Sequence, residues 1–263
     1  MKNAPAIWLT GGITVLVFAV LYAPLFVSLL FSLVEIKRGV IQWDTLSFSP
    51  YLTLWSNASV ISALSNTAQV AVVSVVIACI LAVALALYTE SEGAIGRRVI
   101  ELVIYLPFLM PPIVTGLALL VASAETGVPR GLATIIVGHA VFVLAVAYRL
   151  VLTRLQSLPP SLVQASADLG ASRWQTLRLV LLPHLASAVM TGAVLALTLS
   201  FDETLISTFL AGDQMTLPLR LWAMMRVGFT PEVNALVTLV LLVSIALAVV
   251  VAWRMKPDDM GEE

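Results

Sequence analysis

Residues 164–183 read QASADLGASRWQTLRLVLLP and interrupt a chain that is apolar on both sides of them. The stretch holds two arginines, Arg173 and Arg178, together with Asp168, a central Gly170 and a closing Pro183. Its apolar residues recur at helical spacing. An ordered pattern of this kind, in a connection between apolar segments, favours a docking element that inserts into a groove of another protein over a simple spacer.

Local signals predict two short helices here. A pair of prolines ends the preceding helix, and Ser161 with Gln164 three residues later has the spacing of a capping box. Gly170 predicts either a helix C-cap or a close approach by another backbone. Residues 174–182 predict a second, amphipathic helix that lies along the membrane, and Pro183 then begins the next span.

Composition places the chain in a membrane. Of its 263 residues, 60% are hydrophobic and 11% are charged, and the mean hydropathy is +1.03. Soluble domains carry about 25% charged residues, so this chain has too little polar surface to cover itself in water. The net charge of -1 gives no field that would favour nucleic acid. The single cysteine, Cys79, excludes a disulfide framework within the chain and lies in an apolar run, where an inert thiol is expected.

Six apolar runs are long enough to cross a hydrocarbon core of roughly 30 Å as helices. The first run is too long for a signal-peptide core and is interpreted as a retained span. The predicted fold is therefore an all-α integral membrane protein with six transmembrane helices. The runs cover residues 7–34, 60–89, 102–124, 131–148, 185–211 and 233–253.

The distribution of basic residues predicts the orientation. With the N-terminus in the cytoplasm, nine of the 14 Lys and Arg residues lie on the cytoplasmic side. Cytoplasmic connections carry the excess of such residues. We therefore expect both termini and residues 164–183 in the cytoplasm.

Three features within or between the spans have two interpretations each. Pro107, Pro111 and Pro112 cannot lie in a straight helix, so the third run breaks there, either as a pathway element or as a structural kink. His139, within the fourth run, is either hydrogen-bonded to a neighbouring helix or a ligand or proton relay. The aromatic residues of segment 35–59 form either an interfacial belt or a surface that receives a delivered solute.

The fifth run contains an acid pair, Asp202 and Glu203. Ionisable groups at membrane depth are costly and indicate a pathway or a paired site. They form either an acidic wall on the route of a cationic solute, or a helix-to-helix network or ion pair, for instance with an arginine of a partner subunit. At about 100° per residue, four polar side chains of this run fall on one stripe, and they are Ser187, Thr191, Thr198 and Asp202.

The stretch at 164–183 resembles the coupling motif of ABC-importer permeases: Glu-Ala-Ala, three residues, Gly, nine residues, an aliphatic residue, one residue, Leu-Pro. Gln164 stands in place of the usual acid and Ser166 in place of the second alanine, so Asp168, one turn later, is the candidate for the acidic contact. The remaining motif positions match at Ala165, Gly170, Val180, Leu182 and Pro183. The resemblance assigns coupling to the ATPase to Gln164, Ala165, Ser166, Asp168, Leu169, Gly170, Ala171 and Pro183.

The C-terminal part resembles a narrower class, the spermidine/putrescine permeases of type I ABC importers. Members of that class have a similar acid pair in the fifth span and a similar Pro-Glu-Val-Asn-Ala stretch before the last one. Here these are Asp202 with Glu203, and residues 231–235. The resemblance is strong over about 164–244 and weaker before it. Permeases for other organic ions, thiamine or ferric iron share much of this layout.

The resemblance implies the type I ABC importer permease fold, with six transmembrane helices and a cytoplasmic coupling helix. It implies one permease domain over residues 1–263, with its core at about 60–254 and its coupling loop at 155–184. The chain is then expected to form half of the translocation path for a small organic solute, a polyamine-like cation such as putrescine or spermidine. Asp202, Glu203 and Thr198 are the expected path residues.

The implied partners are a second, different permease chain, two ATPase subunits and an extracytoplasmic solute-binding protein, all at the bacterial inner membrane. The sequence has no glycine-rich phosphate loop, metal-ligand cluster or nucleophile–base pair, so we expect no catalysis and no cofactor in this chain. ATP and Mg are expected in the partner ATPase. The alternatives are a permease for another solute (an amino-acid-like or other organic ion, thiamine or ferric iron), an autonomous secondary transporter or channel, and a structural anchor.

Overall fold

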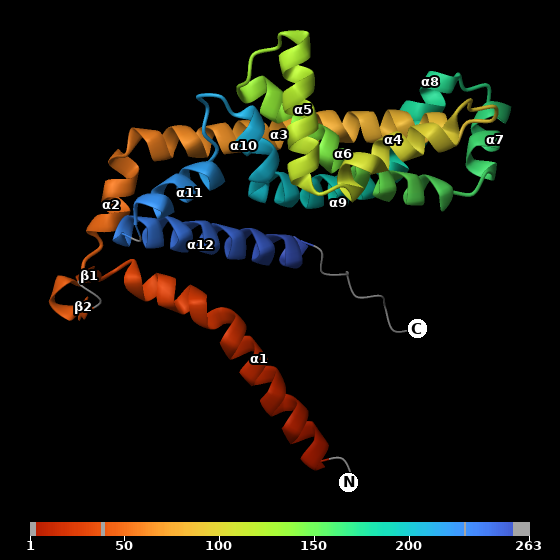
Figure 1. Cartoon of the computed structure of the whole chain (residues 1–263). Helices are drawn as coiled ribbons and strands as arrows, with labels where there is room; N and C mark the ends of the chain where they lie inside the picture. Colours follow the sequence, from red (N-terminus) through yellow and green to blue (C-terminus); the bar gives the residue numbers. More distant parts are fainter. Residues whose placement is uncertain (1–3, 38–39, 229, 255–263) are drawn as a thin grey trace. The chain divides into compact units, whose positions relative to one another are not determined.

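The computed structural model describes residues 4–37, 40–228 and 230–254, and most of these residues are helical (Figure 1). The predicted all-α membrane fold is confirmed, and the strands of the described part form one small hairpin. The expected single permease domain stays a prediction. By its contacts the chain separates into two compact units, Met1–Ile61 with Leu221–Glu263, and Ser62–Arg220.

The first unit joins the two ends of the chain. Its longest helix, α1, packs on α12, and α12 also contacts α2. The two strands pair antiparallel, with Ile36 opposite Ile41. The elements of this unit are α1 (Ala4–Phe31), β1 (Glu35–Lys37), β2 (Val40–Gln42), a 3-10 turn (Trp43–Thr45), α2 (Ser49–Ser56) and α12 (Pro231–Arg254).

The second unit holds every residue to which the sequence assigns a site. Its centre is the pair α6 and α9, which pack along each other. The elements here are α3 (Ala58–Thr89), α4 (Arg97–Leu109), α5 (Pro112–Thr126), α6 (Leu132–Gln156), α7 (Ser161–Asp168), α8 (Arg173–Thr176), a π-helical turn (Leu177–Leu181), α9 (Leu182–Asp202), α10 (Leu205–Leu210) and the start of α11 (Leu217–Val227).

Small residues allow this packing. A Cβ atom added at Gly192 of α9 would lie 3.4 Å from the Cα atom of Ala147 in α6, so the two backbones approach closely. Lipid is as apolar as the helix surface, and helices in a membrane associate through such close contacts. Two buried clusters fill the unit. One includes Val70, Ile135, Val143, Ile206 and Leu210, and the other includes Ile104, Tyr148, Val151, Leu152 and Leu185.

Among the residues that the structure describes, four helices are long and apolar enough to span a membrane, and a bent helix pair makes up to five. The last apolar run lies in α12, whose apolar helix Pro231–Ala246 is shorter than the others. The number of six spans therefore stays a prediction. The four single spans are Thr10–Phe31, Ala58–Thr89, Leu132–Gln156 and Arg173–Asp202.

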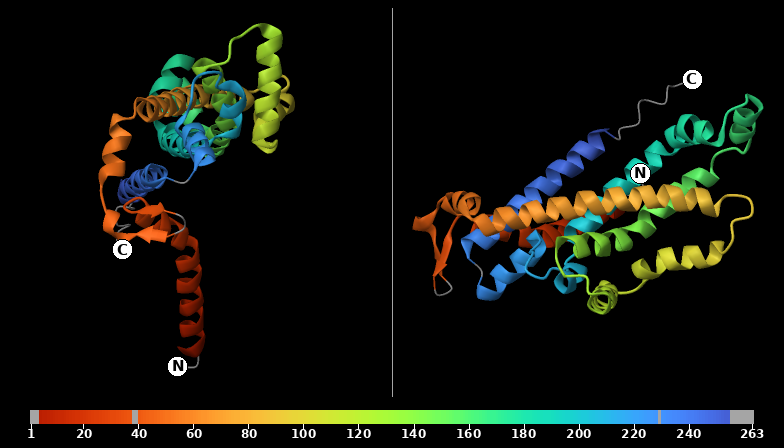
Figure 2. Two further views of the ribbon diagram at one scale, coloured as in Figure 1. Left: turned by 60° about the vertical axis from the view of Figure 1, so that its left-hand side comes forward. Right: turned by 90° about the horizontal axis from the view of Figure 1, so that it is seen from above.

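The prolines of the third run break it, as predicted. α4 and α5 meet at a bend of 111°, and in the view from above in Figure 2 α5 is seen nearly end-on while α4 runs across the picture. Pro111 has no N–H to donate to the carbonyl of Pro107 four residues earlier. The Thr115 hydroxyl donates to that carbonyl instead, at 3.2 Å. A side chain thus satisfies a backbone group that the bend leaves free within an apolar segment.

The fifth run, predicted as one span over residues 185–211, is two helices. α9 ends at Asp202 and α10 begins at Leu205. The break occurs because Glu203 adopts an extended conformation (φ -72°, ψ 111°). Two interactions hold the chain there. The Glu203 carboxylate accepts the N–H of Ile206 at 3.0 Å, and its backbone carbonyl accepts the Ser207 hydroxyl at 3.3 Å.

Candidate functional site

The loop between α6 and α9 contains the predicted coupling helix, α7. The predicted capping box of Ser161 and Gln164 is wrong, because Ser161 is already the first helical residue and Pro160 occupies the N-cap. A capping box forms at α8 instead. The Ser172 hydroxyl accepts the N–H of Gln175 at 3.3 Å, and the Gln175 side chain accepts the N–H of Ser172 at 2.7 Å.

Gly170 ends α7 as a C-cap. Its N–H donates to the carbonyl of Ala167 at 2.8 Å, and the N–H of Ala171 donates to the carbonyl of Ser166 at 3.1 Å. These two bonds make a Schellman motif, in which the glycine takes the left-handed conformation, here with φ +78°. A Cβ atom at Gly170 would meet nothing within 4 Å in this chain. The glycine is therefore required by the turn and not by a close contact within the chain.

Six of the eight predicted coupling residues are exposed, and Ala171 is half-buried. The side chains of Gln164 and Asp168 make no hydrogen bond or ion pair with the described part of the chain. Leu169 is 89% exposed, and Trp174 beyond the turn is 65% exposed. The loop thus presents free polar groups and large apolar side chains together. The six exposed residues are Gln164, Ala165, Asp168, Leu169, Gly170 and Pro183.

Ser166, the eighth coupling residue, turns inward. Its hydroxyl lies 2.8 Å from that of Thr176 in α8, and both residues are buried. The bond fastens α7 to α8. Ser166 thus positions α7 and lies away from its exposed surface. Sequence reasoning missed Thr176, because the spacing of ten residues across a turn carries no local signal.

The helix after the turn is continuous with the fifth span. From Arg173 to Asp202 the structure forms one helix of 30 residues. The prediction of a separate membrane-lying helix over residues 174–182 is therefore wrong. A proline within a helix clashes with the carbonyl four residues earlier. The wider π-helical turn Leu177–Leu181 directly precedes Pro183, and the His184 ring lies 2.7 Å from the carbonyl of Val180. These features let the helix continue past Pro183 without a break.

The structure separates the roles of the two acids. Asp202 is the last residue of α9, and its carboxylate is exposed and makes no hydrogen bond or ion pair with the described residues. The half-buried Glu203 caps α10 through Ile206. The ion pairs among the described residues lie elsewhere, where Arg97 contacts Glu90 at 2.6 Å and Glu101 at 3.0 Å. Asp202 is therefore the free acid of the pair.

The predicted polar stripe lies on the exposed face of α9 in this chain. Its members are Ser187, Thr191, Thr198 and Asp202. The hydroxyls of Thr191 and Thr198 donate to the carbonyls four residues earlier, at 2.9 and 3.0 Å. Threonine hydroxyls bonded in this way need no partner from another helix. Among the described residues, the stripe thus leaves the Asp202 carboxylate at one end and the Ser187 hydroxyl at the other without a partner.

A buried polar network lies directly behind the break. His139 of α6 contacts the hydroxyl of Ser200 in α9 and that of Ser207 in α10, both at 2.8 Å. Ser200 also lies 3.2 Å from the Ser74 hydroxyl of α3. The interpretation of His139 as hydrogen-bonded to a neighbouring helix is confirmed. Sequence reasoning missed Ser207, although its spacing of seven residues from Ser200 returns to the same side of a helix.

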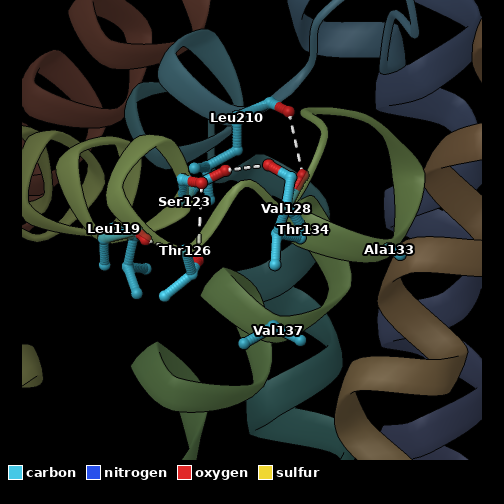
Figure 3. Close-up of a pocket in the computed structure, with 9 residues that line it drawn as sticks. Leu119, Ser123, Thr126, Val128, Ala133, Thr134, Val137 and Leu210 are labelled. Carbon is cyan, nitrogen blue, oxygen red and sulfur yellow. Dashed lines mark hydrogen bonds between the residues drawn. The ribbon is translucent and has the colours of Figure 1, made fainter.

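A cavity of about 300 Å³ between α5, α6 and α10 does not suit a cationic solute. Figure 3 shows that it has no charged side chain, and its hydroxyls are bonded within the chain. Ser123 donates to the carbonyl of Val128 at 2.6 Å, and Thr134 donates to that of Leu210 at 3.1 Å. No group of three or more metal-ligating side chains occurs among the residues that the structure describes.

Comparison with known proteins identifies the class of this chain. Residues 74–256 match the family described as binding-protein-dependent transport system inner membrane component. The spermidine/putrescine transport system permease protein PotC of Escherichia coli K12 is 31% identical over 244 residues, which cover 92% of this chain and 91% of the relative. The putrescine transport system permease protein PotI of the same strain is 32% identical over 263 residues, covering 96% and 93%.

Solved structures share the fold. A chain of a bacterial ABC transporter involved in the import of the acidic polysaccharide alginate aligns with a TM-score of 0.71 at 16% identity, over 98% of both chains. A chain of the inward-facing MetNI methionine ABC transporter aligns with a TM-score of 0.61 at 21% identity, over 78% of this chain and 96% of the other. The chain therefore belongs to the binding-protein-dependent transport system inner membrane components, and is the membrane-spanning permease subunit of an ABC importer whose ATPase is a separate subunit.

Proposed function

We propose that this permease forms half of the translocation path for a polyamine-like cation such as putrescine or spermidine, and that Asp202 contacts the cation. Glu203 shapes the path by holding the break, and Thr198 lies one turn before Asp202 on the same exposed stripe. The relatives PotC and PotI, named for spermidine and putrescine transport, support this solute class.

The observation that carries the proposal is the free Asp202 carboxylate at the end of α9. The C-terminus of a helix carries about half a negative charge, and cations are stabilised there. Asp202 adds a full charge at the same place. Glu203 offsets the opposite, positive end of α10 by accepting the N–H of Ile206. The broken helix thus leaves a net negative site, and broken helices supply such sites in other transporters.

The coupling role belongs to the loop at 164–183. We infer that α7 docks on the ATPase through Gln164, Ala165, Asp168, Leu169, Gly170 and Ala171. Asp168 supplies the acid that the first motif position lacks, because it is exposed and unpaired among the described residues. Leu169 supplies apolar contact area. An exposed apolar side chain beside free polar groups fits a groove on a partner protein.

A rigid connection joins the docking site to the acid. The helix Arg173–Asp202 has 30 residues, and at 1.5 Å per residue it extends about 45 Å. Pro183 lies within it, so a displacement at the loop is transmitted past Pro183 to Asp202. Ser166 and Thr176 fasten α7 to the start of this helix. Closure of the ATPases on ATP and Mg then moves α7, and the movement exposes Asp202 alternately to the two sides of the membrane.

The proposed assembly contains a second, different permease chain, two ATPase subunits and an extracytoplasmic solute-binding protein. It lies in the bacterial inner membrane with both termini of this chain in the cytoplasm. The excess of basic residues on that side supports the orientation. An autonomous secondary transporter is not favoured, since the chain belongs to a binding-protein-dependent family.

The test is uptake of labelled putrescine by the complete complex with Asp202→Asn. Loss of a charge-assisted contact removes about 1.5–3 kcal/mol, so KM rises about 10- to 100-fold. Glu203→Gln keeps an acceptor oxygen for Ile206 and changes KM much less. Asp213→Asn is the matched control, because it removes an exposed acid outside the pair. Unchanged KM and unchanged solute-stimulated ATP turnover with Asp202→Asn contradict the proposal.

The solute class is tested separately. The cognate solute-binding protein is screened by thermal shift against polyamines, amino acids, thiamine and ferric iron. We expect stabilisation by putrescine or spermidine, since a ligand that binds only the folded state raises the unfolding midpoint. If another class of solute stabilises the binding protein and polyamines do not, that class replaces polyamines as the proposed solute. The coupling proposal is unaffected by that result.

A further inference from the structure

A buried histidine spans the break in the fifth span, and the proposed path uses none of its polar atoms. His139 is 1% exposed. Its Nδ1 atom lies 2.8 Å from the hydroxyl of Ser200, the third-last residue of α9, and its Nε2 atom lies 2.8 Å from that of Ser207 in α10. One side chain therefore bonds to both halves of the broken helix, on either side of Asp202 and Glu203.

The directions of these bonds follow from the number of protons. The Ser207 hydroxyl has one proton and donates it to the backbone carbonyl of Glu203. Its oxygen therefore accepts from His139, which places the ring proton on Nε2. The unprotonated Nδ1 atom then accepts from the Ser200 hydroxyl. The Ser200 oxygen accepts from Ser74 at 3.2 Å when the Ser74 proton turns away from the carbonyl of Ala71, which is also at 3.2 Å. Both ring nitrogens are then bonded, and the chain of bonds ends on the carbonyl at the break.

Apolar contacts alone do not set the rotation of α10. This helix has six residues, too few to be stable by itself. It packs closely against two glycines: an added Cβ atom would lie 2.9 Å from Phe209 at Gly116, and 2.7 Å from Ile206 and Leu210 at Gly138. These contacts hold α10 near α5 and α6, and at its end the Leu210 carbonyl accepts the N–H of Gly131 at 2.9 Å and the Thr134 hydroxyl at 3.1 Å. The bond to Ser207 adds a directional contact on the side of the break.

We propose that His139 is a positioning residue that locks α10 in register with α9 and thereby sets the direction of the Asp202 carboxylate. The effect on solute rests on the proposed function, whereas the lock itself does not. Buried, fully satisfied polar networks specify one arrangement of the elements they join. His139 acts through Ser200, Ser207 and the Glu203 carbonyl, and does not touch the solute.

Four variants separate positioning from stability. His139→Leu removes both bonds and leaves the buried Ser200 and Ser207 hydroxyls with one partner fewer each. His139→Gln keeps a donor and an acceptor on one terminal amide. A triple variant, His139→Leu with Ser200→Ala and Ser207→Ala, removes the bonds and both partner hydroxyls together, which restores stability without restoring direction. Thr89→Val is the matched control, because it breaks another buried hydroxyl pair between α3 and α6, at 2.9 Å from Tyr148.

The first readout is amide hydrogen exchange of the peptide over residues 203–211 in the complete complex in nanodiscs. It needs no knowledge of the solute. We expect exchange about tenfold faster in His139→Leu, equal to about 1.4 kcal/mol of lost protection, and near the native rate in His139→Gln. Thr89→Val leaves this peptide unchanged. The second readout is KM for the solute, expected to rise about tenfold in the triple variant while its unfolding midpoint stays near that of the native complex.

Each outcome decides the proposal. Native exchange over residues 203–211 in His139→Leu shows that the lock does not hold α10, and overturns the proposal whatever the solute is. If Thr89→Val speeds exchange over residues 203–211 as much as His139→Leu does, the effect is a general destabilisation of the bundle. That result also overturns the proposal. A native KM in the triple variant overturns the positioning role. If the complex imports another solute, the same KM comparison is made with that solute, so a failure of the polyamine assignment is told apart from a failure of the lock.

Discussion

Gly170 allows backbone strain to be separated from bulk at the docking site. Its φ of +78° lies in the left-handed region, and no atom of this chain lies within 4 Å of an added Cβ. An L-residue in this conformation costs about 1–2 kcal/mol, whereas asparagine tolerates it. Gly170→Ala therefore adds strain with little bulk, Gly170→Asn adds bulk with little strain, and Gly170→Val adds both.

The strain acts on the end of α7. If the Schellman turn opens, the hydrogen bonds from Gly170 and Ala171 to α7 are lost, and Leu169 no longer has a fixed direction. A strain of about 1.4 kcal/mol lowers the population of the native turn by at most tenfold, and the apparent affinity falls by the same factor. We therefore expect Gly170→Ala to weaken docking up to about tenfold, Gly170→Val to weaken it more, and Gly170→Asn to stay within about twofold of the native chain.

The assay is titration of the purified ATPase subunit onto the permease pair in nanodiscs, with the affinity and the solute-stimulated ATP turnover measured for each variant. Gly127→Ala, at the end of α5, is the matched control, since Gly127 also has a positive φ, of 69°, with no atom within 4 Å. Native affinity for both Gly170→Ala and Gly170→Val contradicts the coupling role of the turn. Equal damage by Gly170→Asn and Gly170→Val contradicts the strain argument and shows that the ATPase approaches Gly170 closely.

The remaining predictions concern the packing around the loop and the breaks. Ser166→Ala removes the bond that fastens α7 to α8, so the affinity for the ATPase and the unfolding midpoint both fall by the equivalent of about 1 kcal/mol. Ser166→Thr retains the hydroxyl and is the control. Equal affinity and equal midpoint for the two variants contradict the role of the bond. Gly138→Ala places a methyl group 2.7 Å from two side chains of α10 and costs about 1–3 kcal/mol, read as a lower midpoint than Gly11→Ala, which meets nothing within 4 Å. Thr115→Val frees the carbonyl of Pro107 and lowers the free energy of unfolding by about 1 kcal/mol, which is read as a lower midpoint in the same assay, whereas Thr115→Ser retains the bond. Equal midpoints for the two variants contradict the role of the hydroxyl.

Membrane class and most spans could be predicted from local patterns. Long apolar runs must be helical in lipid, because each segment has to satisfy its own backbone. Pro111 predicted the bend because a proline removes a donor wherever it stands. Gly170 predicted a C-cap because few other residues adopt the left-handed conformation. These are properties of single residues or short windows, and they hold before any helix meets another.

Other features could not be predicted from the sequence, because residues far apart in the chain determine them. Ser161 and Gln164 fit the capping-box pattern, yet Ser172 and Gln175 form the box, since two compatible start signals compete and the turn at Gly170 settles where α8 begins. Pro183 was expected to begin a helix, but a π-helical turn just before it lets the helix continue.

The acid pair shows the division most plainly. The sequence showed that two carboxylates lie inside an apolar run, where their energetic cost indicates a pathway or a paired site. Two identical charges side by side in sequence gave no basis for distinguishing them. Tertiary structure distinguishes them, because the break turns Glu203 onto Ile206 and leaves Asp202 at the end of α9. The break is held by His139, which lies over 60 residues earlier in the chain. Local periodicity determines which segments are helices, whereas hydrogen bonds across the bundle decide where a helix stops and which acid stays free.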